Sequence, residues 1–302
     1  ACHFKKVHYN SCSNRHCPNC QGIKKEKWID DRYFDLLPVK YFHGVFTVPS
    51  ELRILFKYNK KILYNLLFTC VKETLFEFGL DKRQKLEAKM GAICILHTWN
   101  QQLQYHPHIH CIIPAGGLNK DGLWKETKGK NDFLFSVKAL SSKFKQKFLI
   151  NLVELYKNKQ LKIPNHARLW NTPCDFYQTK SNLYNNNWVV YAKESFGGPQ
   201  QVFEYLGRYT HRIAISNHRI IKVDNTHVTF KYLDRKTNKS KTKQIKGEDF
   251  IFHFLQHVLP PRFTKIRHFG FLSSRSKKSD LPIIRKALNA HDPGLKVKLS
   301  TR

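Results

Sequence analysis

Two kinds of hydrophobic pattern divide this chain into segments. Runs rich in aromatic and β-branched residues are typical of strands, and apolar residues spaced three and four apart are typical of helices. The first pattern predicts strands at 41–48, 91–99, 105–114 and 188–192, and a β meander at 213–216, 219–223 and 226–232. The second predicts helices at 23–37, 50–79, 137–160, 199–212 and 248–258, and a short helix and basic tail from residue 277. We interpret 164–187 and the basic stretch 234–246 as loops.

The segment 105–110, with the sequence YHPHIH, carries the clearest chemical signal. Side chains alternate between the two faces of a strand, so His106, His108 and His110 share one face. Neutral imidazoles held at this separation can bind a divalent metal ion, and an ion with open positions can polarise a phosphoryl oxygen. This strand is therefore the candidate seat of catalysis.

A third ligand is expected from one of two histidines. The short polar link after strand 91–99 predicts that this strand pairs antiparallel with 105–114, which would bring His97 close to His108 and His110. His106 already lies in the same row and is the competing candidate. We favour His97 because donation from a neighbouring strand encloses an ion better than three residues in line.

The first 20 residues are rich in cysteine and too polar to form a hydrophobic core. A closed tetrahedral zinc site suits such a segment, because the metal replaces the missing core. The expected thiolate ligands are Cys2, Cys12, Cys17 and Cys20, and His3 or His16 could replace one of them. Nearby cations expected to contact phosphates include Arg15, Lys24 and Lys25. The other cysteines are interpreted as small core residues in a reducing compartment: Cys70, Cys94, Cys111 and Cys174.

The chain carries a large excess of positive charge, with 53 Lys and Arg against 22 Asp and Glu and a formal net charge of +31. Such an excess favours a polyanionic partner, and nucleic acid is the obvious one. No apolar run reaches the ~18 residues of a membrane span, so we expect a soluble intracellular protein. The chain begins at Ala1 without an initiator Met, so we expect a preceding segment.

The predicted helix 199–212 places two tyrosines on one face. Tyr205 and Tyr209 are four residues apart, with Arg208 and Arg212 beside them. A phenolic oxygen can attack a phosphodiester when cations stabilise the developing charge, although tyrosines on a helix are more often packing residues.

The late segment 262–275, with the sequence RFTKIRHFGFLSSR, interleaves cations with aromatic residues. Arg267 and Arg275 are its candidate DNA contacts, because such interleaving suits backbone contact and base stacking on a single strand. A half-buried basic strand is an equally good interpretation.

Four stretches, in this order along nearly the whole chain, resemble the transposases of the IS91 and ISCR group. They are YNSCSNRHCPNCQ, HTWNQQLQYHPHIHCIIPAGG, YLGRYTHRIAISNHRI and IRHFGFL. The resemblance implies an HUH-type single-strand DNA endonuclease with His108 and His110 as metal ligands. Tyr205 and Tyr209 match its two tyrosines, and Tyr209 is the first choice of nucleophile because some relatives carry only that one. Cys12, Cys17 and Cys20 match its zinc motif with Cys2 next, and the pattern usually has another cysteine three residues before Cys2.

The resemblance also implies a fold, which is α+β with a central antiparallel sheet, helices packed on one face and an N-terminal zinc-binding module. We divide the chain into a zinc module with a linker helix at 1–37, a nuclease domain at 38–232 and a basic C-terminal region at 233–302.

The implied reaction is cleavage and rejoining of single-stranded DNA at element ends through a 5′-phosphotyrosine, with Mg²⁺ or Mn²⁺ at the histidines and structural Zn²⁺ at the cysteines. It would drive rolling-circle-type transposition, with hairpin element ends and target DNA as partners, in the bacterial cytoplasm at the nucleoid. The alternatives are a plasmid or phage replication initiator with the same chemistry, and a non-catalytic zinc-containing nucleic-acid-binding protein. No oligomeric state is predicted.

Overall fold

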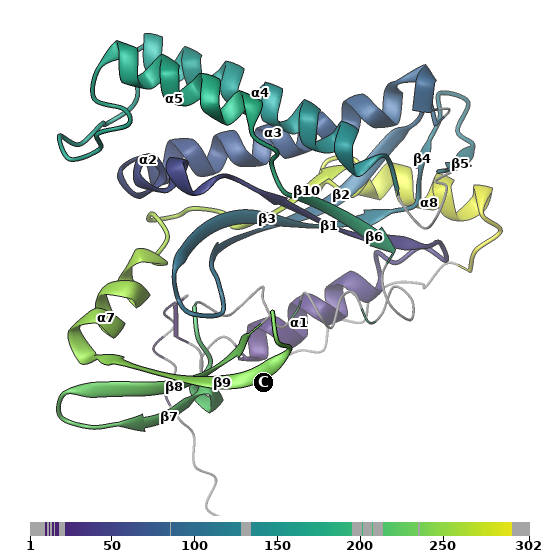
Figure 1. Cartoon of the computed structure of the whole chain (residues 1–302). Helices are drawn as coiled ribbons and strands as arrows, with labels where there is room; N and C mark the ends of the chain where they lie inside the picture. Colours follow the sequence, from purple (N-terminus) through teal and green to yellow (C-terminus); the bar gives the residue numbers. More distant parts are fainter. Residues whose placement is uncertain are drawn as a thin grey trace, which may run out of the picture.

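The computed structural model describes residues 22–84, 86–127, 134–194, 214–234 and 236–291, and seven further residues: 10, 12, 14, 16, 17, 201 and 207. Figure 1 shows its layers: helices α3, α4 and α5 on one side of a main sheet, and a smaller sheet on the other side. The fold is α+β with antiparallel pairing, as predicted. None of the helices in the described ranges is long and apolar enough to span a bilayer.

The main sheet has the strand order β5-β4-β2-β3-β1-β6, with β10 also paired to β2. Strands β1, β2, β3 and β6 correspond to predicted strands, whereas β4 and β5 were not predicted. Their bounds are β1 Tyr41–Thr47, β2 Lys89–Trp99, β3 Tyr105–Pro114, β4 Gly116–Leu118, β5 Trp124–Glu126, β6 Val190–Glu194 and β10 Ile266–Gly270. The predicted antiparallel pairing of β2 with β3 is confirmed, and it sets His97 opposite His108.

The main hydrophobic core lies between this sheet and the helices α2 (Arg53–Tyr58), α3 (Lys60–Leu80), α4 (Val137–Lys157) and α5 (Pro173–Asn185). Alternation along β3 turns Ile109 and Cys111 towards the helices, where they meet the fully buried Phe46 of β1 and Phe144 of α4. Burying each large apolar side chain contributes about 1.5–3 kcal/mol. Burial of these residues therefore also fixes which side chains of β3 lie on the opposite face of the sheet.

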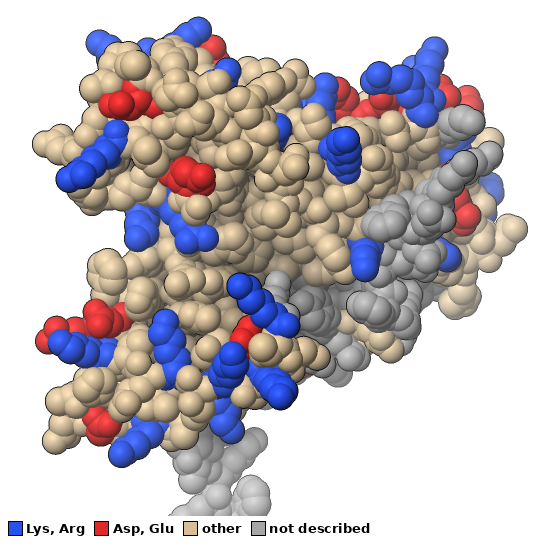
Figure 2. All heavy atoms as spheres, viewed as in Figure 1, with Lys and Arg blue, Asp and Glu red and all other residues tan. Residues whose placement is uncertain are grey.

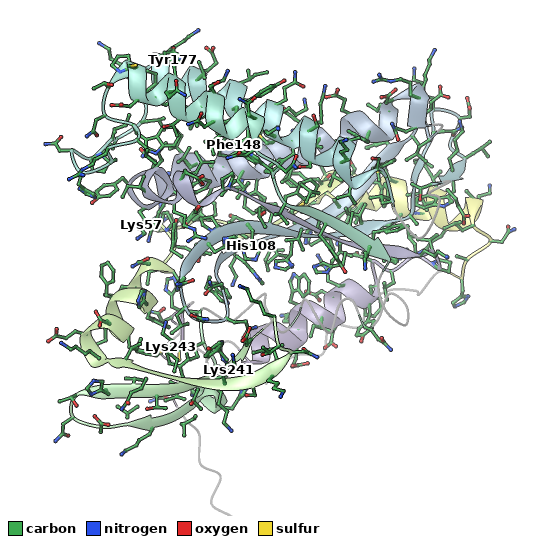
Figure 3. All side chains as sticks on the ribbon, in the orientation of Figure 1. Lys57, His108, Phe148, Tyr177, Lys241 and Lys243 are labelled. Carbon is green, nitrogen blue, oxygen red and sulfur yellow. The ribbon has the colours of Figure 1, made fainter. Side chains whose placement is uncertain are left out.

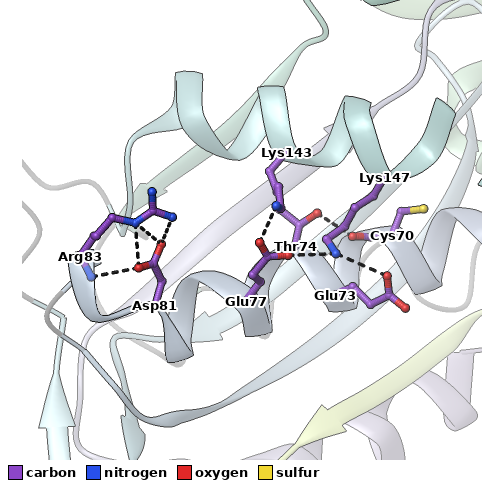
Figure 4. Close-up of polar contacts among 8 residues, drawn as sticks. All are labelled: Cys70, Glu73, Thr74, Glu77, Asp81, Arg83, Lys143 and Lys147. Carbon is purple, nitrogen blue, oxygen red and sulfur yellow. Dashed lines mark hydrogen bonds and ion pairs between the residues drawn. The ribbon is translucent and has the colours of Figure 1, made fainter. Parts of the chain in front are cut away.

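Polar side chains join α3 to α4 at the edge of this core (Figure 4). Lys143 and Lys147 of α4 both form ion pairs with Glu77 of α3, at 2.5 and 2.9 Å. All three side chains are partly exposed to solvent, so each ion pair adds about 0–1 kcal/mol to the stability. Their main effect is on the orientation of α4 relative to α3.

A second apolar cluster covers part of the other face of the sheet. Ile93, Ile95 and Ile112 pack there with Leu281 and Ile284 from α8 (Lys277–Ala287). Helix α1 (Gly22–Tyr33) adds Trp28 to the edge of this cluster. Further along β2 and β3, the same face of the sheet carries His97, His108 and His110.

The smaller sheet corrects one prediction. It consists of β7 (Ile220–Val223), β8 (His227–Asp234) and β9 (Lys239–Lys246), and α7 (Gly247–Gln256) packs on it. The interpretation of 234–246 as a loop was wrong, because β9 pairs with β8 over its whole length and its lysines occupy a sheet edge, where charge is tolerated. The hairpin crosses the boundary predicted between residues 232 and 233.

The first strand of the predicted meander is also absent from the described structure. Residues 214–216 form no strand, and Ala214 has a φ of 56°. The chain therefore turns at this point, and the small sheet begins only at β7.

Helix α5 corrects the interpretation of 164–187 as a loop. Thr172 and Asp175 form a reciprocal cap, and Pro173 occupies the first turn, so the helix begins despite the many asparagines around it. Cys174 lies in this helix and is exposed, so its assignment to the core was wrong. Cys70, Cys94 and Cys111 are buried as predicted.

Candidate metal and phosphate site

Three histidines from β2 and β3 form a group whose geometry suits a metal ion. His97, His108 and His110 each offer one ring nitrogen, and these nitrogens all lie within 4.8 Å of one another. The three side chains are 3–8 % exposed, so they are almost completely removed from solvent. Neutral imidazoles gathered in this way are good ligands for a divalent ion.

The backbone fixes the tautomer of His108. Its Nδ1 donates a hydrogen bond to the carbonyl oxygen of His106, 2.6 Å away, which leaves Nε2 with a lone pair. That Nε2 lies 3.0 Å from Nε2 of His110. Metal-binding histidines commonly donate their other nitrogen to such an acceptor, because the bond orients the ring.

His43 of β1 supports His110 in a similar way. Its Nε2 lies 2.8 Å from Nδ1 of His110, and the two rings stack at 5.1 Å with an interplanar angle of 6°. Burial lowers the pKa of His43 to about 4, so its ring is neutral at pH 7 and can accept a hydrogen bond from His110. Nε2 of His110 then remains available for a metal.

His43 is not among the site residues predicted from the sequence. A possible signal was its place in the predicted strand 41–48, where it alternates with the apolar Phe42 and so lies on the opposite face of the strand. Only the register of β1 against β3, however, brings it beside His110.

Of the two candidates for the third ligand, the structure brings His97 and not His106 into the group found among the described residues. The ring of His97 stacks on Trp99, with 4.8 Å between centroids. His106 instead lies beside the group, 5.0 Å from the ring of His108, with Nη2 of Arg53 at 3.5 Å from its Nδ1. The ligand roles themselves stay a prediction.

A tight link places the two histidine strands in register. The Asn100 side chain accepts hydrogen bonds from the backbone N–H groups of Gln102 and Gln104, both at 2.9 Å. Leu103 takes a positive φ of 64° and is fully buried. The polar residues that predicted a connection therefore fold it into a compact turn, and β3 returns directly alongside β2.

The donor set indicates which ion fits. Three imidazoles suit a borderline transition-metal ion, whereas Mg²⁺ prefers oxygen ligands and water. A site with three protein ligands would keep positions open for a phosphate oxygen. The residues present therefore fit a divalent transition-metal ion better than Mg²⁺.

Several predicted site residues lie outside the described residues: Tyr205, Arg208, Tyr209, Arg212, Arg15, Cys2 and Cys20. Gln201 and Gly207, the described residues of the predicted helix 199–212, are both helical. Lys24 and Lys25 lie on α1, where only their backbone is described. Cys12 is exposed and Cys17 is partly buried, so neither forms part of a hydrophobic core.

Arg267 and Arg275 occupy different environments. The Arg267 guanidinium lies 4.2 Å from the ring centre of Phe68 and donates to Asn65, on the helix-covered face opposite the histidines. This position agrees with the interpretation of the segment as a half-buried strand. Arg275 is exposed just before α8. Contact of either residue with DNA stays a prediction.

Comparison with known proteins relates both the N-terminal region and the region that carries the histidines to transposases. The profile of a family described as "Putative transposase" matches residues 91–280, and that of a "Transposase zinc-binding domain" matches residues 1–48. A "Putative transposase y4qJ" from Sinorhizobium fredii is 38 % identical over 97 % of this chain and 73 % of the relative. The "Transposase for insertion sequence element IS801" from Pseudomonas savastanoi pv. phaseolicola is 29 % identical over 99 % of this chain and 70 % of the relative.

Proposed function

The chain belongs to the IS91 family of transposases, and we propose that it cleaves and rejoins single-stranded DNA at element ends through a covalent 5′-phosphotyrosine. In this proposal it is an HUH-type nuclease and strand transferase that drives rolling-circle transposition in the bacterial cytoplasm. The observation that carries the proposal is the buried group of His97, His108 and His110, because no hydrophobic core requires three converging imidazoles.

The proposed cleavage step exchanges one phosphodiester bond for another. The Tyr209 oxygen attacks the scissile phosphorus, the bond from phosphorus to the 3′-oxygen breaks, and that oxygen takes up a proton as the phenol loses one. A divalent ion bound at the histidines supplies positive charge that polarises the phosphate. Arg208 and Arg212 neutralise the charge that develops on the phosphate. A second 3′-hydroxyl reverses the step and joins the strands without ATP.

The chain around the tyrosines supports this assignment. Before them, β6 pairs with β1 and places Lys193 opposite His43 and Tyr191 opposite Val45, on the histidine face. After them, Ala214 packs with Leu103, which lies in the link between the two histidine strands. The described residues on both sides of the intervening segment therefore pack against the strands that carry the histidines or the link between them, and we infer that the tyrosines reach the candidate metal site.

The test uses single-stranded oligonucleotides that span the two element ends, labelled at the 3′ end. With Mn²⁺ the full chain should become covalently labelled, because the 5′ phosphate of the labelled fragment stays on the protein. Tyr209→Phe should abolish the adduct, and Tyr177→Phe, on exposed α5, should retain it. Mn²⁺ should support the reaction at lower concentration than Mg²⁺.

Two outcomes would redirect the assignment. Binding without any adduct would favour the non-catalytic nucleic-acid-binding protein. An adduct without excision or insertion of a marked element in cells would favour the replication initiator. Tyr205→Phe separates the roles of the tyrosines, since loss of strand transfer with normal first cleavage would assign it the second step.

A further inference from the structure

Two basic walls face each other beside the histidine strands. On α2, Arg53 and Lys57 lie one helical turn apart. On β9, Lys241 and Lys243 occupy alternate positions and so share one face. Figure 2 shows the molecule hollowed between these parts, with basic side chains on both lips, and Figure 3 places Lys57 and Lys243 on opposite sides of the hollow.

Cations from both sides of the hollow act on His253 of α7. The pKa of Lys57 is lowered by burial and then by the charge of Arg53. The pKa of His253 on α7 is lowered by burial and then by Lys243, with Asp249 opposing this effect and Lys57 adding to it. Such a concentration of positive charge around the hollow favours a polyanion between the walls.

Two buried polar atoms point to the same missing partner. Within the described residues, Nε of Arg53 and Nδ1 of His253 are buried and have no hydrogen-bond partner. Buried polar atoms are usually satisfied. One of these nitrogens comes from α2 and the other from α7, which supports a polar ligand between the two helices. The walls also lead to the candidate metal site, because Arg53 reaches His106 beside His108.

One end of the hollow is fastened. Nζ of Lys60, at the start of α3, donates to the carbonyl oxygens of Gln256 and Val258, at 2.8 and 3.0 Å. Gln256 is the last residue of α7 and Val258 follows it, so the Lys60 cation lies at the negative end of the helix. Lys60 therefore links the start of α3 to the end of α7. Arg53, Lys57 and Lys243 remain to contact the ligand.

The chemistry of the walls favours a single strand. Alternate side chains on β9 repeat about every 6.6–6.8 Å, a spacing that the phosphates of an extended strand can follow. Phe252 of α7 is 60 % exposed, and its ring lies 6.0 Å from that of His253. An exposed aromatic ring stacks on an unpaired base, whereas the bases of a duplex already stack on one another.

We propose that this cleft, formed by Arg53, Lys57, Lys243 and His253, with the exposed Phe252 next to His253 on α7, binds an extended single strand of DNA and guides it to the histidines. The phosphates lie against the three cations, and one base stacks on Phe252. The proposal rests on the proposed function in that DNA is the substrate, and it adds the path of the strand and the contribution of the small sheet.

The test compares two double variants of the full chain that remove equal charge. Lys57→Gln with Lys243→Gln changes the cleft, and Lys138→Gln with Lys231→Gln is the control; each lowers the net charge from +31 to +29. Lys231 lies on the same small sheet as Lys243 but on its opposite face. Binding is measured by fluorescence anisotropy with labelled oligo(dT) of about 20 nucleotides, without added Mg²⁺ or Mn²⁺.

The cleft variant should bind oligo(dT) about tenfold more weakly, and its salt slope should fall by about 1.4, the value for two lost phosphate contacts. The control should change less than about twofold. Phe252→Ala should weaken single-strand binding several-fold, whereas Leu255→Ala, equally exposed on α7, should not.

Equal weakening by both double variants would overturn the proposal, because it would show that the charge acts diffusely. Equal losses on a duplex of the same length would overturn the single-stranded occupant. Oligo(dT) binding needs no cleavage, so a failure to form the tyrosine adduct would leave this result standing. Thermal unfolding of each variant checks that these solvent-accessible substitutions leave the fold intact.

Discussion

At the scale of single residues, the candidate metal site depends on hydrogen bonds that set which ring nitrogen is free. His108 is oriented by a backbone carbonyl, and His110 by a second imidazole, that of His43. A carbonyl can only accept, but His43 can accept only while it is neutral and correctly turned. The support of His110 is therefore the one that a single substitution can remove.

We predict that His43→Leu weakens Mn²⁺ binding by about ten- to a hundredfold, because His110 loses the acceptor that fixes its tautomer. His43→Gln should recover part of the affinity, since its amide oxygen can accept the same bond. The measurement is a metal titration of the adduct-forming reaction, with His166→Gln on the exposed loop before α5 as the control. Unchanged metal affinity in His43→Leu would assign His43 a packing role only.

At the scale of elements, the joining of β10 to β2 depends on one glycine. Gly270 has a φ of 61°, and a Cβ there would overlap the carbonyl oxygen of Met90. Both effects oppose any side chain. Strand β10 consequently ends at a position that only glycine can fill.

We predict that Gly270→Ala lowers the free energy of unfolding by about 3 kcal/mol, through backbone strain and a steric clash. Gly247→Ala is the matched control, because a Cβ there would lie 3.6 Å from the Thr226 carbonyl oxygen, an ordinary contact. It should change stability by less than about 0.5 kcal/mol. Urea denaturation compares the two, and equal effects would contradict the argument.

The elements also show which patterns can be interpreted from sequence. The β2–β3 pair was predictable because two clear strands are joined by a short link, and His97 follows from that pairing. Strand β9 was not predicted because its lysine and threonine residues carry little hydrophobic signal. Helix α5 was not predicted because its capping residues lie among many asparagines. The place of His43 beside His110 could not be predicted from the sequence, because packing across the whole sheet decides which strand lies beside β3.

At the scale of the whole molecule, the N-terminal segment contacts the region that follows α7. Nε2 of His16 accepts a hydrogen bond from the backbone N–H of Leu259, at 3.3 Å. This segment carries Cys12 and Cys17, two of the predicted zinc ligands. The contact connects the predicted zinc module to the segment after α7, the helix that carries His253 of the proposed DNA cleft.

We predict that Cys17→Ser lowers the zinc content of the purified chain by about one ion, because a tetrahedral site needs four ligands. Cys174→Ser, at an exposed cysteine of α5, should retain the metal. Atomic emission on protein prepared without chelators measures the content. A full zinc complement in the double variant Cys12→Ser, Cys17→Ser would exclude the predicted ligand set.

The pairing of β2 with β3 also has a consequence for errors in folding. The same alternation that turns His97, His108 and His110 to one side turns Leu96, Ile109 and Cys111 to the other. A slip of one residue in a strand would bury its imidazoles under the helices and expose its oily side chains to water. Misassembled copies of the candidate metal site should therefore be insoluble, and soluble protein should carry its histidines correctly aligned.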